Sequence, residues 1–425
     1  MGGASPCCIP PAMRFLHPQP LRLVVSLMIP LGMIGQAISQ EVSPPVELRA
    51  ARDPSDSPPS PLIAPRDPLA GEKRSQGIDL GVIVSAAYDD NIFLSARDAK
   101  ADFVGTVSPE MGYSKGDRDS QDGGYLKFAY RPTAVMYARN SGDNRIDHEA
   151  KAAIGVIGAK ASIDYSVAYG KLGDATPDTG RQADRQVLEQ VVRIAWVPRE
   201  KLAVELAAGQ NIADYADKVL LDSREAFGEI ALRYAYSPKT RVGLAYRAGR
   251  FEVDEMDDQR FQRLTGKIEW QPREKIRIEL EAGAEKRKYA NGSSVTPVVE
   301  GRIEWKASEK TNFFLNAYRR ETASAFSAGQ NYRLTGASAG FSQRIGEKWT
   351  AHLEAGAERA AYRQVEGPET DTGTDKLWFV RPSLEYRLTE EMGLEIFYRI
   401  SSNTSNRDGF GYDQQTAGIL FDYKF

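Results

Sequence analysis

Alternation of apolar and polar residues over long segments is the feature that most constrains this chain. From Lys275 to Glu285, every second residue beginning at Ile276 is apolar, and most of the residues between them are charged. Successive side chains of a strand point to opposite faces, so this period predicts strands with one apolar face. Strands of soluble proteins are typically about five or six residues long, whereas segments of about ten residues match tilted strands that cross a bilayer.

Tight turns recur between these segments at the spacing of a two-strand hairpin. The phrase Pro198-Arg199-Glu200-Lys201 returns as Pro272-Arg273-Glu274-Lys275. A unit of tight turn, strand, looser acidic loop and returning strand is typical of antiparallel hairpins. We expect an all-β fold, a transmembrane antiparallel up-and-down β-barrel of about 16–18 strands, with short turns in the periplasm and loops outside.

Aromatic residues mark the ends of the apolar faces. They stand just before tight turns, where an interfacial girdle belongs, at Trp196, Tyr236, Trp270, Trp305 and Tyr386. The last segment alternates to the end of the chain and resembles the carboxy-terminal signature of outer-membrane barrels, which the assembly machinery reads. We therefore expect an assembly signal at Phe421, Tyr423 and Phe425, with membrane lipid and the barrel-assembly machinery as partners.

The amino-terminal part has a different pattern, which divides the chain into three expected segments. Basic Arg14 and Arg22 precede or begin an apolar run, and Ala37-Ile38-Ser39 fits a small-x-small cleavage site. Residues 1–39 are thus expected to be a signal peptide, with Met13 as an alternative start. Residues 40–76 are Pro-rich and expected to be a disordered periplasmic linker. Residues 77–425 are expected to form the barrel, in the outer membrane of a bacterial cell.

Composition excludes several other classes of protein. Lys and Arg number 55 against 58 Asp and Glu, which argues against nucleic-acid binding. The two cysteines, Cys7 and Cys8, precede the expected cleavage site, so the mature chain would have neither disulfides nor thiol chemistry. We expect no cofactor and no metal site. Asp89-Asp90 with His148 at the outer rim could activate water, but catalysis is not expected, and the acidic loop Glu366–Asp375 is expected to be solvated rather than a calcium site.

The polar set of alternate residues would line the lumen. Opposite charges on neighbouring strands can form cross-strand ladders, and no ring of one sign predicts ion selectivity. Two interpretations are consistent with this pattern: a hydrated lumen wall whose charges pair with one another, and a conduit for a polar solute. The expected lumen-lining residues are Glu205, Glu229, Arg233, Arg247, Lys267, Glu269, Arg277, Glu279, Arg302, Glu304, Arg381, Glu385 and Arg399.

The phrase Tyr88-Asp89-Asp90-Asn91-Ile92-Phe93 resembles the opening of the β-barrel porin 2 family. Later strand ends such as Tyr246-Arg247 and Tyr398-Arg399 also resemble it. The resemblance implies an outer-membrane barrel that accompanies exopolysaccharide synthesis and export, and it carries no catalytic residues.

We therefore expect a passive conduit for a polar solute. The leading candidate is secreted exopolysaccharide, with periplasmic export components as partners. The alternatives are a structural or interaction barrel with a closed lumen, and a general diffusion porin. No outer loop is clearly long enough to fold inward as a constriction, which counts against the porin.

Overall fold

The computed structural model describes residues 76–116, 123–176, 178–179, 181–326, 329–366 and 372–425. The expected signal peptide and nearly all of the expected linker lie outside these residues. Most described residues belong to strands, as the alternation predicted. No helix of the described residues is long and apolar enough to span a membrane.

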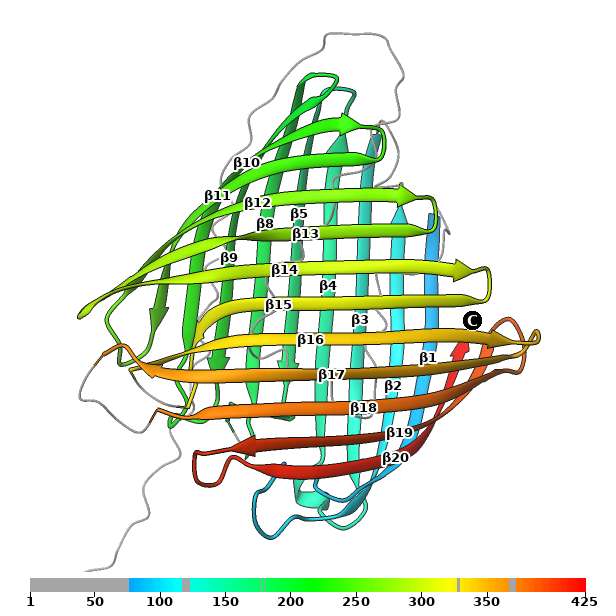
Figure 1. The fold of residues 1–425 in the computed structure, drawn as a ribbon. Helices are drawn as coiled ribbons and strands as arrows, with labels where there is room; N and C mark the ends of the chain where they lie inside the picture. Colours follow the sequence, from blue (N-terminus) through cyan, green and yellow to red (C-terminus); the bar gives the residue numbers. More distant parts are fainter. Residues whose placement is uncertain (1–75, 117–122, 177, 180, 327–328, 367–371) are drawn as a thin grey trace, which may run out of the picture. The chain divides into compact units, whose positions relative to one another are not determined.

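Eighteen antiparallel strands form one closed sheet (Figure 1). Closure occurs where β1 (Gln76–Asp89) pairs with both β2 (Asp102–Lys115) and β20 (Tyr412–Lys424). The barrel and the higher of the two expected strand counts are confirmed. The other strands of the sheet are β3 (Gly123–Tyr137), β4 (Arg145–Ile157), β5 (Ala161–Leu172), β8 (Arg185–Arg199), β9 (Leu202–Tyr215), β10 (Ser223–Ser237), β11 (Thr240–Val253), β12 (Gln259–Arg273), β13 (Ile276–Tyr289), β14 (Gly292–Ser308), β15 (Thr311–Ala323), β16 (Gln330–Ile345), β17 (Trp349–Gln364), β18 (Thr374–Arg387) and β19 (Met392–Ser405).

Two very short strands and a single helical turn lie in the loops. The strands β6 (Ala175–Thr176) and β7 (Arg181–Gln182) pair with each other in the loop between β5 and β8. The 3-10 turn η1 (Ser141–Asp143) lies between β3 and β4. The sequence pattern predicted neither, because two residues are too few to show a period.

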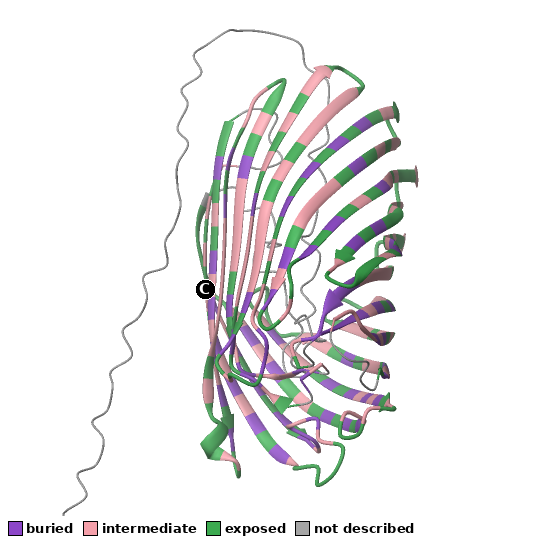
Figure 2. Ribbon diagram, turned by 90° about the vertical axis from the view of Figure 1, so that its left-hand side faces the viewer, coloured by how far each residue is buried: buried purple, intermediate pink, exposed green. Residues whose placement is uncertain are grey.

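Apolar side chains cover the outside of the barrel. Exposed and covered residues alternate along the strands (Figure 2), and Leu244 and Leu264 are 60% and 59% exposed. Aromatic rings gather where the tight turns begin, with the ring centroids of Trp349 and Tyr386 only 4.6 Å apart. A closed barrel satisfies its backbone hydrogen bonds internally, so it can expose apolar side chains to lipid. An apolar outer band with an aromatic girdle is the surface of a bacterial outer-membrane barrel, and this location, too, agrees with the sequence.

The ring of strands is interrupted near its outer end between β14 and β15. Their pairing stops at Val299 and Arg319, although β14 begins seven residues earlier, at Gly292 (292 to 299), and β15 ends at Ala323. Beyond that point the end of β15 lies against the inner face of β14, since Thr296 Oγ1 donates a 2.6 Å hydrogen bond to Glu321 Oε2. The outer ends of β15 and its neighbours therefore bend into the lumen.

Candidate functional site

The described residues of the loop between β5 and β8 (173–176, 178–179 and 181–184) extend across the outer mouth of the barrel. Asp178 Oδ1 accepts hydrogen bonds from Ser324 Oγ (2.9 Å) and Tyr362 Oη (3.0 Å). Its Oδ2 accepts a third from the backbone N–H of Ala325 (2.8 Å). These donors belong to β17 and to the segment after β15, and β9 to β14 lie between them and β8 in the ring. We call these three hydrogen bonds the Asp178 latch.

Other outer loops join across the mouth as well. Ala175 packs on a buried cluster of Leu94, Leu377 and Tyr412, which belong to the loop after β1, to β18 and to β20. The backbone N–H of Leu221, before β10, donates to the carbonyl of Ala325 at 2.8 Å. The expectation that no outer loop folds inward is therefore wrong. That expectation rested on loop length alone, and it could not include the partners that hold the loop in place, because they are far away in the sequence.

A cationic and aromatic cluster surrounds the latch. Burial raises the pKa of the Asp178 carboxyl above its usual range, and the three hydrogen bonds and the charge of Arg407 partly offset this. The Arg407 guanidinium lies 3.7 Å from the ring centroid of Tyr362 and also pairs with Asp375. Tyr332 faces the same carboxylate. The latch thus holds a buried carboxylate that is compensated by three hydrogen bonds and by the nearby charge of Arg407.

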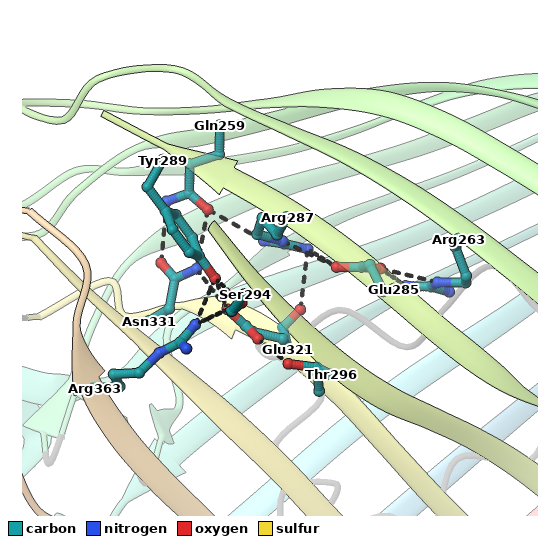
Figure 3. Close-up of polar contacts among 10 residues, drawn as sticks. All are labelled: Gln259, Arg263, Glu285, Arg287, Tyr289, Ser294, Thr296, Glu321, Asn331 and Arg363. Carbon is teal, nitrogen blue, oxygen red and sulfur yellow. Dashed lines mark hydrogen bonds and ion pairs between the residues drawn. The ribbon is translucent and has the colours of Figure 1, made fainter. Parts of the chain in front are cut away.

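A chain of alternating charges lies beneath the latch, between the inner wall of β12–β14 and the bent ends of β15–β17 (Figure 3). Glu285 binds Arg263 (2.6 Å) and Arg287 (2.8 Å) through its two carboxylate oxygens. Arg287 donates to the Glu321 carbonyl (3.3 Å), and the Glu321 carboxylate pairs with Arg363 (2.8 Å). The side chains of Glu285 and Glu321 are only 1% and 3% exposed. Each of these two buried carboxylates is paired with a guanidinium group, as burial of a charge requires.

Neutral polar groups extend this network toward the outer end. Gln259 and Asn331 exchange two side-chain hydrogen bonds of 3.1 and 2.9 Å. Arg363 donates to Ser294 at 3.0 Å, and Tyr289 donates to the Glu321 carboxylate. The network therefore fixes the bent ends of β15–β17 against the wall opposite them.

A cavity that is partly open to solvent lies next to the latch and this network. Its wall carries both signs of charge and several hydroxyl groups together with apolar side chains such as Leu221 and Phe251, so it offers a solute both polar and apolar contacts. The lining includes Asp178, Glu225, Arg263, Arg287, Arg320 and Tyr332.

The structure places the predicted lumen residues in the inward-facing sets of their strands, where many of them pair. Arg233 bridges Glu205 (2.9 Å) and Glu269 (3.1 Å). Glu229 binds Arg247 (2.7 Å) and Lys267 (3.1 Å). A role for them in transport stays a prediction. The remaining pairs are Arg277 with Glu279, Arg302 with Glu304, Arg381 with Glu395 and Glu385 with Arg387, while the Arg399 guanidinium lies over the ring of Phe379.

Sequence reasoning missed the residues of the latch and of the bent strand ends. Glu321 and Arg363 fall in the outward sets of β15 and β17, so alternation placed them toward lipid. The bend brings them inside instead. Charged residues in an otherwise apolar set were the one signal that could have found them. Asp178 gave no signal, because its partners are distant in the sequence.

The catalytic alternative finds no support in the geometry. Asp89 faces inward, where it accepts hydrogen bonds from the N–H of Asn91 (2.8 Å) and from Gln414 (2.9 Å). His148 belongs to the outward set of β4, and its Nδ1 contacts Tyr130 Oη at 2.8 Å. Within the described residues no cluster of His, Cys, Asp and Glu could hold a metal ion. Part of the acidic loop Glu366–Asp375 lies outside those residues.

Neither the family models nor the curated proteins include a match to this chain. The resemblance to the β-barrel porin 2 family is thus carried only by the residues quoted above. Solved structures from Pseudomonas aeruginosa are similar in fold. OpdQ is 11% identical over 82% of this chain and 97% of its own, with a TM-score of 0.43. The outer membrane protein OpdK is 11% identical over 82% and 99%, with a TM-score of 0.41. Similarity at this level says nothing about what passes through this barrel.

Proposed function

We propose that this protein is a passive outer-membrane channel for a small polar solute, narrowed at its outer mouth by the loop that Asp178 latches. A barrel of this strand count encloses a lumen wide enough for water. Its inner wall carries charges of both signs, which replace part of the hydration of a polar solute without selecting one type of ion. The observation that carries the proposal is the inward loop, because it leaves a partly open cavity beside a constriction rather than a wide duct.

Exopolysaccharide is the second candidate solute. The resemblance at Tyr88–Phe93 favours it, and a hydroxyl-rich polymer is compatible with a wall of mixed charge. Passage of a polymer requires the loop to leave the mouth, because the latch and the contacts of Leu221 and Ala175 join parts of the wall that are not neighbours in the ring. Export components of the periplasm would then be partners. The closed mouth makes a small solute the better proposal.

Single-channel recording on the folded protein in planar bilayers tests the channel. We expect a small conductance in the wild type and a larger one after residues 174–183 are replaced by a short Gly-Ser linker. The matched control replaces residues 141–143, the exposed turn η1, in the same way and should leave the conductance unchanged. If the wild type and the shortened variant are both silent, the channel is refuted and the structural barrel remains.

Liposome swelling with sugars of increasing size then separates the two solutes. We expect uptake of small sugars and exclusion of oligosaccharides by the wild type. A clean deletion strain supplies the complementary measurement. Loss of surface polysaccharide in that strain would favour the polymer, whereas an unchanged amount together with conductance would support the small solute.

A further inference from the structure

Like-charged side chains lie side by side on the outer surface of the barrel, near its outer end. On β17 and β18, Arg359 and Lys376 are direct cross-strand partners. Both are exposed and belong to the outward sets of their strands, next to Trp378, which is 44% exposed. Among the described residues neither side chain has an ion pair or a hydrogen bond.

A second group of the same kind lies on β11–β13. Arg250 is the cross-strand partner of Arg260, and Arg260 is the partner of Lys288. All of these side chains are exposed. Arg250 is compensated by Glu252 and Asp258. Arg260 and Lys288 have no acidic partner within the described part of the chain.

Both groups lie at one height above the aromatic girdle. Arg359 follows Trp349 by ten residues (349 to 359), and Lys376 precedes Tyr386 by ten (376 to 386). Arg260 likewise precedes Trp270 by ten residues (260 to 270). At about 3.3 Å per residue and a tilt of about 40°, ten residues rise about 25 Å, which is the height of the apolar band of such barrels. The cations therefore lie at the outer membrane–water interface.

Two cations directly opposite each other destabilise a sheet unless an anion lies between them. Phosphate groups of lipids are the anions found at this height, and guanidinium and ammonium groups bind phosphate by charge-assisted hydrogen bonds. We propose that the pair Arg359–Lys376 and the pair Arg260–Lys288 each bind a phosphate group of a phosphorylated lipid in the outer leaflet. Trp378 and Leu264 lie next to the pairs on the membrane side and would contact its acyl chains. This proposal does not depend on whether the lumen conducts.

Native mass spectrometry of the full-length protein folded in detergent tests the proposal. The probes are bisphosphorylated lipid A and the same lipid without its phosphates. The wild type should bind the phosphorylated lipid at least about tenfold more tightly, and each double variant, Arg359→Gln/Lys376→Gln or Arg260→Gln/Lys288→Gln, should lose one bound lipid or weaken it about thirty-fold. Equal binding of both lipids by the wild type would overturn the proposal.

A matched control removes two cations from the periplasmic turns, with Lys239→Gln/Lys310→Gln, and should bind lipid as the wild type does. Heat-modifiable gel mobility checks that each variant is folded, and the comparison of the two lipids on the wild type decides the outcome if a variant is not. Inorganic phosphate added at the same concentration as the lipid separates the two sources of phosphate. If it displaces the lipid at equal concentration, the pairs read free phosphate rather than a lipid head group and the proposal fails.

Discussion

Replacement of Asp178 by Ala removes the acceptor of all three latch hydrogen bonds. A hydrogen bond to a charged acceptor contributes about 1.5–3 kcal/mol, and burial of the carboxylate offsets part of the sum. The raised pKa of Asp178 indicates that this offset exceeds the stabilisation of the charge, so the loss on replacement comes mainly from the donors of Ser324, Ala325 and Tyr362, which lose this acceptor at a cost of about 1–3 kcal/mol each. We therefore take the net loss as about 2–4 kcal/mol in favour of the open loop, which is a shift of about 30- to 1000-fold in the ratio of open to closed forms.

Single-channel recording measures this ratio as the fraction of time spent in the larger conductance state. We expect brief and rare openings in the wild type and dominant openings in Asp178→Ala. Asp178→Asn keeps one acceptor oxygen and nearly the same shape, so it should lie between them. The control is Asp143→Ala in the exposed turn η1, with no expected effect. If Asp178→Ala and the control give the same open fraction, the latch does not hold the loop and the reasoning fails.

Three further predictions concern pH, stability and assembly. The raised pKa means that the closed loop binds a proton more tightly than an open, solvated one. Lowering the pH through the raised value toward 3.8 should therefore reduce the open fraction, and Asp178→Asn should remove this dependence. Glu285→Ala leaves the buried Arg287 and the half-buried Arg263 without their shared carboxylate and should lower the free energy of unfolding in urea by about 3–5 kcal/mol, against about 0–1 kcal/mol for the more exposed Glu279→Ala. Deletion of Phe425 should leave unfolded protein in the periplasm, and wild-type amounts of heat-modifiable barrel would argue against an assembly signal.

The strands were predictable because each one is constrained locally. Alternation assigns every residue to one of two faces, and a closed barrel requires the same alternation around the whole ring. The expected first strand begins close to the observed Gln76, and the last strand ends the chain as expected. The inward position of residues such as Glu229 and Arg233 follows from the exposed Ile230 and Leu232 beside them.

The mouth was not predictable in this way. A loop has no period, so the position of Asp178 depends on which distant donors it meets. Ser324, Ala325 and Tyr362 are brought together only when β15–β17 bend inward. The bend itself depends on β14 and β15 parting at Val299, and the one local signal is Pro297, which has no N–H to offer a neighbouring strand and lies two residues beyond the last pair.

Charged residues in the outward sets therefore lie either inside the barrel or on its surface, and the pairing of the neighbouring strands determines which. Where neighbouring strands part, as above Val299 and Arg319, the outward face of one strand can fold over the inner face of the next, and Glu321 finds Thr296 and Arg287. Where pairing continues past the charged residues, as between β17 and β18, the side chains stay on the surface, and Arg359 and Lys376 have no counter-charge within the described part of the chain. A cation in an apolar set thus indicates either a strand that leaves the wall or a contact with the membrane surface, depending on whether the ladder continues beside it.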